Sequence, residues 1–245
     1  MKGRIAAAAA TAAMIVLGSG TGALRAETAV SPAPVVVELF TSQGCSSCPP
    51  ADQFLGELAA RTDVIALAFH VDYWDYIGWK DPYAMPAATA RQRAYADTLG
   101  LHTVYTPQMV IDGRLDVVGS HRSGVEAAIG KATAQRKLAL EITATAGHAR
   151  VVVPAGKADE RGEVLLVVFD SRRETPVKRG ENAGRTLVEH NIVRDVLRLG
   201  TWTGEAATFE IELGPTMADH DGCAVLVQAA GQGTILGAAL IPAAW

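Results

Sequence analysis

The stretch from Val35 to Pro50 reads VVVELFTSQGCSSCPP and decides how the first half of the chain folds. It begins with a nearly continuous apolar run, Val35 to Phe40, which is typical of a strand buried on both faces. Cys45 and Cys48 follow with two residues between them, and an amphipathic segment comes next. A strand that leads through Cys-x-x-Cys into a helix indicates redox chemistry, because a helix N-terminus lowers the pKa of a nearby thiol.

The spacing of Cys45 and Cys48 is compatible with more than one role. Two thiols at this spacing can form a small disulfide that exchanges with protein thiols through a mixed disulfide. The same spacing supplies half of a structural zinc site, but such a site needs four ligands and the remaining cysteine is Cys223. An inert structural disulfide is the third role. We interpret the pair as redox-active and keep the other two roles as alternatives.

The first 26 residues are typical of a secretory signal peptide. Lys2 and Arg4 precede an apolar run at 5–17, and small residues follow up to Ala26, where we expect cleavage. Residues 27–34 would then form a linker. Because the apolar run is too short to span a bilayer comfortably, we predict a periplasmic or secreted protein with no membrane association after cleavage.

The charge balance argues against nucleic acid as a partner. The 245 residues include 22 Lys and Arg against 26 Asp and Glu, and removal of Lys2, Arg4 and Arg25 leaves 19 basic residues and a net charge of −7. Domains that bind nucleic acid are normally basic. The expected partners are protein thiols or disulfides, together with an electron-transfer partner that the sequence does not identify.

Strands and helices are predicted to alternate up to residue 137. The helix after Cys48 has Leu55 and Leu58 on its apolar face, and Asp52 is expected on the opposite, polar face. The sequence then predicts a strand at 64–69, a helical insert at 81–100, a hairpin at 106–119 that turns at Asp112-Gly113, and a final helix at 125–137.

This order of elements resembles the thioredoxin superfamily over residues 35–137. In that family a cis-proline lies against the redox pair and presents backbone to the substrate, and Thr106-Pro107 occupies that place here. The resemblance implies that Cys45 is the exposed nucleophile and that Cys48 resolves the mixed disulfide. Three blocks look more narrowly like a family of secreted bacterial thioredoxin-like proteins labelled a domain of unknown function: ELFTSQGC at 38–45, HVDYW at 70–74 and YTPQ at 105–108.

Two features depart from the usual thioredoxin pattern. Pro49 and Pro50 favour a helix that starts at Pro49, which would leave both cysteines on the loop before it. Gly44 replaces the Trp that usually precedes the first cysteine, and a glycine permits close approach of a client backbone.

His70 ends the second predicted strand, at the edge where ligands usually meet an open α/β sheet. There it could stabilise the Cys45 thiolate, move a proton or bind copper(I) together with Cys45 and Cys48. The structural alternative is a histidine that is hydrogen-bonded at a strand end. Asp72 is likewise either a general base or ligand, or a cap for the segment that follows.

A group of aromatic side chains follows His70. They are expected either to line a client groove or to pack the helical insert onto the sheet, and they are Tyr73, Trp74, Tyr76, Trp79 and Tyr83. Further along, Arg91 and Arg93 are predicted on a solvated helix face.

Residues 138–245 are predicted to form a separate β-rich domain. About seven apolar or alternating segments indicate a β-sandwich, which would bind or position rather than catalyse. Cys223 lies in one of these segments, where a buried and inert thiol is expected. The loop from Lys178 to Arg185 is interpreted as a hairpin connection or, alternatively, a site for an acidic partner.

Taken together, the sequence predicts an α/β thioredoxin-like domain with a central mixed sheet, followed by the β-rich domain. We predict a thiol-disulfide oxidoreductase that needs no cofactor, with its site formed by Cys45, Cys48, Thr106, Pro107 and His70. The alternatives are a copper(I)-binding protein or metallochaperone, and a non-catalytic interaction protein with a structural disulfide.

Overall fold

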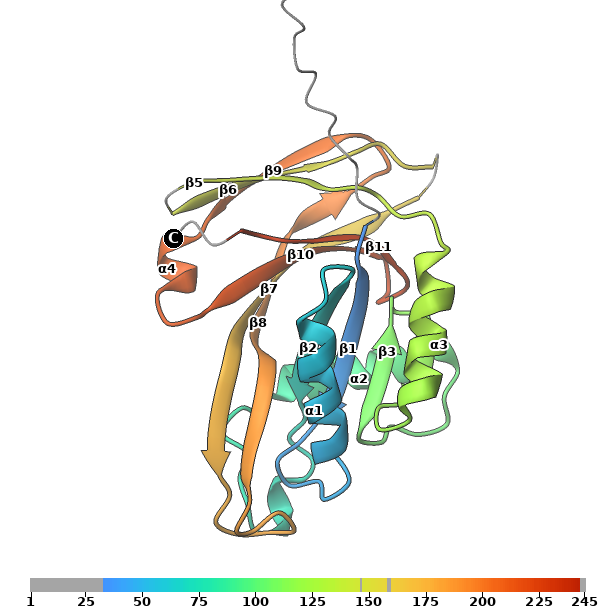
Figure 1. Ribbon diagram of the computed structural model, residues 1–245. Helices are drawn as coiled ribbons and strands as arrows, with labels where there is room; N and C mark the ends of the chain where they lie inside the picture. The colour runs from blue at the N-terminus through green and yellow to red at the C-terminus, as the bar shows by residue number, and fades with distance from the viewer. Residues whose placement is uncertain (1–32, 146, 158–159, 243–245) are drawn as a thin grey trace, which may run out of the picture. The chain divides into compact units, whose positions relative to one another are not determined.

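Two β-sheets and the helices packed on them make up the structure (Figure 1). The computed structural model describes residues 33–145, 147–157 and 160–242. The predicted signal peptide, and the predicted linker apart from residues 33–34, lie outside the described residues.

The larger sheet has eight strands in the order β11-β10-β7-β8-β2-β1-β3-β4. From the first half of the chain come β1 (Val35–Thr41), β2 (Val64–His70), β3 (Gln108–Ile111) and β4 (Leu115–Val118). From the second half come β7 (Gly162–Pro176), β8 (Thr186–Trp202), β10 (Gly222–Ala229) and β11 (Ile235–Leu240). The sheet is mixed, because β2 is parallel to β1 and β8 whereas the other neighbours are antiparallel.

The smaller sheet has the order β5-β6-β9. Its strands are β5 (Glu141–Thr145), β6 (His148–Val153) and β9 (Ala207–Glu212). Side chains such as Val151 and Ile211 pack with Leu166 of β7 and Val225 of β10. The two sheets therefore share one apolar layer, which is how stacked sheets bury their inner faces.

The helices are α1 (Pro49–Ala59), α2 (Pro86–Leu99), α3 (Arg122–Thr133), the short α4 (Gly214–Met217) and the 3₁₀ turn η1 (Asp75–Ile77). Helices α1 and α3 cover one face of the larger sheet near β1 and α2 covers the other, whereas α4 packs near β10 (Figure 1). Leu39 packs with Leu55 of α1 and Ile129 of α3, whereas Phe40 on the other face packs with Tyr95 of α2. β1 is consequently buried along its whole length, as its apolar sequence predicted.

Two local predictions are confirmed. The helix after the cysteines starts at Pro49, because proline lacks the N–H that a first-turn residue leaves unused. β3 and β4 form the predicted hairpin, and Asp112 and Gly113 both have positive φ, 48° and 64°, as a type I′ turn requires.

The two halves of the chain share one sheet, which differs from the separate β-sandwich that the sequence predicted. β8 lies beside β2 and pairs with it in parallel at Ala68 and Ile192. The side-chain amide of Asn191 also donates to the carbonyl of Ala66 at 2.8 Å. The described residues form one compact unit, so the boundary at residue 138 does not divide them. No helix within the described ranges is long and apolar enough to cross a membrane.

The side chain of Arg91 is largely inaccessible to solvent, so its predicted place on a solvated helix face is wrong. Its guanidinium lies 2.7 Å from Glu38 Oε1, and both side chains are nearly inaccessible, at 9% and 0% exposed. It also donates to Tyr95 Oη and Gln228 Oε1, at 3.1 and 3.0 Å. The ion pair therefore joins β1, α2 and β10, which come from the two halves of the chain.

Replacement of Arg91 is expected to destabilise the fold strongly. Arg91→Ala would leave Glu38 charged and unpaired inside the protein, which costs about 3–5 kcal/mol of unfolding free energy. Urea unfolding measures this change. Arg93→Ala is the matched control on the same helix, since Arg93 is exposed and is expected to change stability by less than about 0.5 kcal/mol. Equal midpoints for the two variants would contradict the prediction.

Candidate functional site

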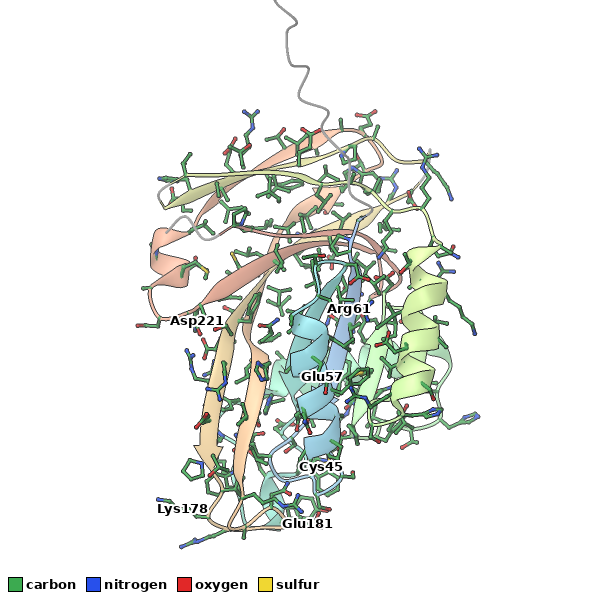
Figure 2. All side chains as sticks on the ribbon, in the orientation of Figure 1. Cys45, Glu57, Arg61, Lys178, Glu181 and Asp221 are labelled. Atoms are coloured by element: carbon green, nitrogen blue, oxygen red, sulfur yellow. A yellow bond between two sulfur atoms is a disulfide. The ribbon has the colours of Figure 1, made fainter. Side chains whose placement is uncertain are left out.

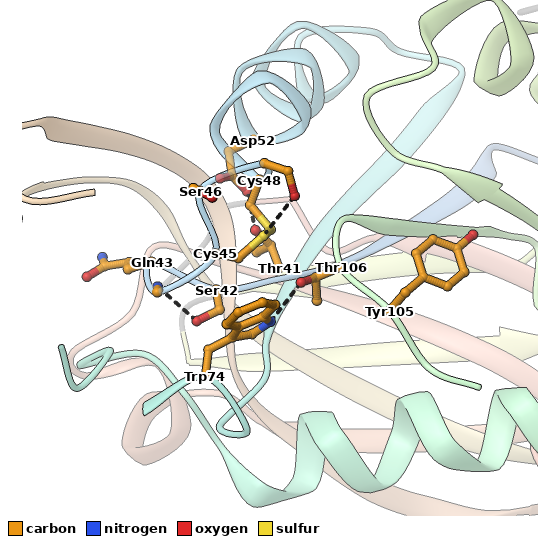
Figure 3. Close-up of a disulfide and its surroundings, with 12 residues drawn as sticks. Thr41, Ser42, Gln43, Cys45, Ser46, Cys48, Asp52, Trp74, Tyr105 and Thr106 are labelled. Carbon is orange, nitrogen blue, oxygen red and sulfur yellow. Dashed lines mark hydrogen bonds between the residues drawn. A yellow bond between two sulfur atoms is a disulfide. The ribbon is translucent and has the colours of Figure 1, made fainter. Parts of the chain in front are cut away.

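Cys45 and Cys48 form a disulfide between the end of β1 and the start of α1 (Figure 3). The loop is tight, because the Cys45 N–H donates to the Ser42 carbonyl and the Cys48 N–H donates to the Cys45 carbonyl. Cys48 is the N-cap residue of α1, and its carbonyl accepts the N–H groups of Ala51 and Asp52. Both cysteines thus precede the helix, as the two prolines indicated.

Both cysteines are buried in this disulfide. Cys45 is 1% exposed and Cys48 is 0% exposed, although Ser46 and Ser47 between them are exposed. The expectation of an exposed Cys45 is therefore wrong for the oxidised form. Ser47 Oγ lies 3.4 Å from Cys45 Sγ, so one serine of the spacer contacts the sulfur directly.

Trp74 and Thr106 lie around the disulfide (Figure 3). The Trp74 indole N–H donates to Thr106 Oγ1 at 2.8 Å, and a Cβ on Gly44 would lie 3.0 Å from Trp74 Cβ. Gly44 therefore allows close packing of the protein's own Trp74. The Thr106-Pro107 peptide is cis, as the resemblance implied, and the Pro107 carbonyl accepts the Gly119 N–H at 2.9 Å.

His70 lies in a buried ion pair with Asp81. His70 Nδ1 is 2.7 Å from Asp81 Oδ2, and both side chains are 0% exposed. Asp81 Oδ2 also accepts the Gln43 N–H at 2.8 Å, so this pair is linked to the loop that enters the disulfide. Among the described residues, no hydrogen bond joins His70 to a cysteine, and its connection to the disulfide runs through Asp81 and Gln43.

Neighbouring carboxylates set the charge of His70. Burial alone would lower its pKa, but Asp81, Glu189 and Asp52 outweigh burial and raise the pKa to about 9. Burial also raises the pKa of Asp81, yet His70 holds that pKa below its usual value. The pair is therefore imidazolium and carboxylate at neutral pH. His70 Nε2 has no hydrogen-bond partner within the described structure, and Glu189 Oε1 is 3.9 Å from it.

Asp52 is a buried carboxyl one helical turn after Cys48, so its predicted place on the polar face of α1 is wrong. Thr41 Oγ1 donates to Asp52 Oδ1 at 2.7 Å. Burial and the negative charge of Glu189 raise the pKa of Asp52 to about 7, against the opposing effect of the Thr41 hydrogen bond. A carboxyl with this pKa can take up or release a proton near neutral pH.

A groove of about 520 Å³ lies between α1 and β8 and reaches Asp52. Its lining residues are Pro49, Asp52, Gln53, Gly56, Glu57, Thr186, Leu187, Val188 and His190.

In the aromatic segment after β2, some side chains pack against the site and one is exposed on the surface. Trp79 Nε1 donates to Gln43 Oε1 at 2.9 Å, and the Tyr83 ring meets the His70 ring edge-on with centroids 5.6 Å apart. Tyr76 differs, because it is 83% exposed. Asp72 Oδ1 accepts the hydroxyl of Thr89 on α2 at 2.6 Å, so its carboxylate bonds to a distant helix and does not cap the segment that follows it.

The structure bears on two further predictions, the inert thiol of Cys223 and the copper(I) site. Cys223 is free and 1% exposed, and burial raises its pKa to about 11, as expected of an inert thiol. Within the described ranges, no group of three or more His, Cys, Asp or Glu side chains is arranged to hold a metal ion. His70, the third ligand of the proposed copper(I) set, is instead paired with Asp81.

Several residues of the site carried no clear signal in the sequence. Gln43 donates through Nε2 to Glu189 at 2.8 Å, and Asn182 donates to the carbonyls of Gln43 and Cys45. Glu189 and Asn182 both come from the second half of the chain. The sequence predicted no residue of this site in that half. Asp52 did carry a signal, because it follows Cys48 by four residues and therefore shares its helix face.

Comparison with known proteins adds a family and a fold, without an activity. A family model described as protein of unknown function (DUF1223) matches residues 36–228. No curated protein matches the chain. The crystal structure of an Agrobacterium tumefaciens protein, from a structural genomics consortium, is 32% identical with a TM-score of 0.76, over 86% of this chain and 95% of that chain. HBP35 of Porphyromonas gingivalis, 15% identical over 87% of this chain and 76% of its own, has a TM-score of 0.58 and is similar in fold alone.

The pKa of Asp52 predicts a dependence of stability on pH. Between about pH 4 and 7 the folded protein keeps a proton on Asp52 that the unfolded chain releases, so wild-type stability falls as pH rises through this window. Asp52→Asn removes this loss while its amide oxygen can still accept the Thr41 hydroxyl. Relative to wild type, the variant should gain unfolding free energy from pH 4 to pH 7, by ~1.4 kcal/mol per unit of removed shift.

Urea unfolding at pH 4, 5.5 and 7 measures this gain. Glu57→Gln is the control on the same helix, because its hydrogen bond with Arg122 lowers the pKa of Glu57 and any pH effect there has the opposite sign. A constant difference between Asp52→Asn and wild type across the window would show that Asp52 has an ordinary pKa.

Proposed function

The chain belongs to the DUF1223 family, and we propose that it is a periplasmic or secreted thiol-disulfide oxidoreductase with a thioredoxin-like arrangement around the pair Cys45–Cys48. The observation that carries the proposal is the disulfide itself, at the junction of β1 and α1. Thr106, which lies beside the disulfide in Figure 3, and the titrating carboxyl of Asp52 support it.

The proposed reaction exchanges one disulfide for another. A thiolate of a protein dithiol attacks Cys45 Sγ, the Cys45–Cys48 bond breaks, and Cys48 leaves as a thiolate that takes up a proton. The second thiolate of the client then attacks the client sulfur of the mixed disulfide, which releases Cys45. The client gains a disulfide and this protein gains two thiols. The reverse sequence reduces a client disulfide with the same atoms, and the client is a protein thiol or disulfide in either direction.

Asp52 supplies a proton-transfer group for this exchange. Its backbone N–H bonds the Cys48 carbonyl, and its pKa of about 7 allows both protonation states at working pH. His70 contributes indirectly, because its charge partly offsets the carboxylates of Asp52 and Glu189. The proposed role of His70 is therefore electrostatic, and Asp81 and Gln43 connect it to the cysteine loop.

The proposed location rests on the sequence of the first 26 residues, which is typical of an export signal. Disulfides persist in the compartments to which such signals lead. An electron-transfer partner in that compartment would restore the oxidation state of the pair after each turnover.

Cysteine substitutions test the proposed exchange. Cys45→Ser is expected to abolish catalysis both of insulin reduction by dithiothreitol and of the oxidation of a dithiol peptide, because no mixed disulfide can form at residue 45. Cys48→Ser is expected to accumulate that mixed disulfide, detectable as an adduct by mass spectrometry. Cys223→Ser is the control and should retain wild-type rates, since Cys223 is buried. Wild-type rates equal to those of Cys45→Ser in both directions would refute the proposal.

Copper(I) binding is the competing outcome and is measured on the same preparations. The reduced protein, purified without oxygen, is titrated with copper(I) beside His70→Ala. Stoichiometric copper that is lost in His70→Ala, together with absent exchange activity, would favour the metal-binding alternative. We expect His70→Ala to leave copper content unchanged, because His70 is engaged with Asp81.

A further inference from the structure

A segment from the second half of the chain contacts the loop that holds the disulfide. This segment, residues 177–185, connects β7 to β8 and is termed the arm. Figure 2 labels Lys178 and Glu181 of the arm at the same end of the structure as Cys45. β7 and β8 stay paired as far as Pro176 and Thr186, so a β-ribbon supports the arm.

Asn182 is the main contact of the arm. Its side chain is 0% exposed, and its Nδ2 donates to the carbonyl oxygens of Gln43 and Cys45, both at 3.0 Å. A side-chain amide has two N–H donors, so both are used. Asn182 Oδ1 accepts from Arg185 Nη1 at 3.1 Å, which fixes the amide in this orientation. Asn182 thus holds the backbone of Cys45 itself.

Two other contacts join the arm to the surroundings of the disulfide. Glu181 Oε2 accepts the Ser46 N–H at 3.2 Å, inside the Cys-x-x-Cys spacer. Gly180, with φ of 75°, packs so closely on Trp79 that a Cβ would lie 3.2 Å from Trp79 Cβ. The arm therefore contacts both the cysteine loop and the aromatic segment whose Trp74 covers Gly44.

The burial of the disulfide in this structure is incompatible with thiol-disulfide exchange at Cys45. An attacking thiolate has to reach a disulfide sulfur, and access limits the rate of this reaction. With Cys45 1% exposed, the loop cannot present its sulfur to a client while its surroundings stay in place. Among the contacts that join the cysteine loop to other parts of the chain, the hydrogen bond from Asn182 is the one made to the backbone of Cys45 itself.

We propose that Asn182 is a positioning residue that holds the Cys45–Cys48 disulfide in a closed arrangement, and that the arm has to lift before a thiol can attack Cys45. The role of the arm in client exchange rests on the function proposed above. The closure itself is a property of the oxidised protein and is tested with a small dithiol.

The rate at which dithiothreitol reduces the disulfide is the measurement. Dithiothreitol becomes a cyclic disulfide as the protein gains two thiols, which are alkylated and counted by mass spectrometry. Asn182→Ala loses two buried hydrogen bonds, so the rate is expected to rise about tenfold. Glu181→Ala loses one exposed bond and should give a smaller rise. Lys178→Ala, an exposed position on the same arm, is the control and should react like wild type.

The urea dependence of this rate separates lifting of the arm from general destabilisation. Local opening exposes little surface, so the rate below the unfolding transition should change little with urea. Reduction through global unfolding would instead follow the full urea dependence of stability. A wild-type rate in Asn182→Ala, or a rise with the full urea dependence, would overturn the proposal.

Failure of the two proposals can be told apart. Faster reduction of Asn182→Ala by dithiothreitol, with no catalysis by any form in the exchange assays, would reject the proposed function and leave the closure intact. Catalysis that depends on Cys45, with an unchanged rate in Asn182→Ala, would reject the closure alone.

Discussion

The buried ion pair between His70 and Asp81 is the interaction on which the surroundings of the disulfide depend. His70 ends β2, and Asp81 lies in the segment that follows η1. The same carboxylate oxygen that meets His70 also accepts the N–H of Gln43, two residues before Cys45. A buried charge that loses its partner is strongly destabilising, so each member of the pair holds the other in place. This pair therefore fixes the loop that enters the disulfide relative to the aromatic segment packed against it.

Gln43 extends this constraint to the second half of the chain. Its side chain donates to Glu189 of β8 and accepts from Trp79, while its backbone is held by Asp81 and Asn182. Because every polar atom of this one residue is used, a change on either side alters the position of the cysteine loop. The site is thus a property of the joined halves, in keeping with a family match that spans residues 36–228.

The elements of the fold could be predicted from the sequence, but the order of the strands could not. The strand before Cys45, the helix from Pro49 and the turn at Asp112-Gly113 follow from local periodicity and turn chemistry. Pairing of β2 with β8 depends on residues about as far apart as Ala66 and Asn191, which are separated by 125 positions. Such pairing leaves no periodic signal, so the sequence pattern of the second half indicates a separate sandwich although its strands join the sheet of the first half.

The residues of the site also fall into those that local sequence motifs reveal and those that only the tertiary fold brings together. Cys45, Cys48, Thr106 and Pro107 belong to short motifs that the sequence displays directly, and the structure brings Thr106 close to the disulfide. Asp52 was readable in principle from its four-residue spacing to Cys48. Asn182 is separated from Cys45 by 137 positions, and no pattern in the sequence indicates that contact.

The mechanical properties of the arm follow from its support. Over residues 172–176 and 186–190, β7 and β8 pair with each other, whereas the backbone register between β8 and β2 in the described structure is confined to Ala68 and Ile192. A two-stranded ribbon is marginally stable by itself, so we expect this part of the sheet to open at lower free energy than the central strands. The cysteines, by contrast, lie in the well-supported centre of the fold, between α1 and the strand β1, which is buried along its whole length. The disulfide is thus held by the central strand and helix, whereas the arm is held by the less supported ribbon. Movement of the arm can therefore change the access of a thiol to Cys45 while the geometry of the disulfide is preserved.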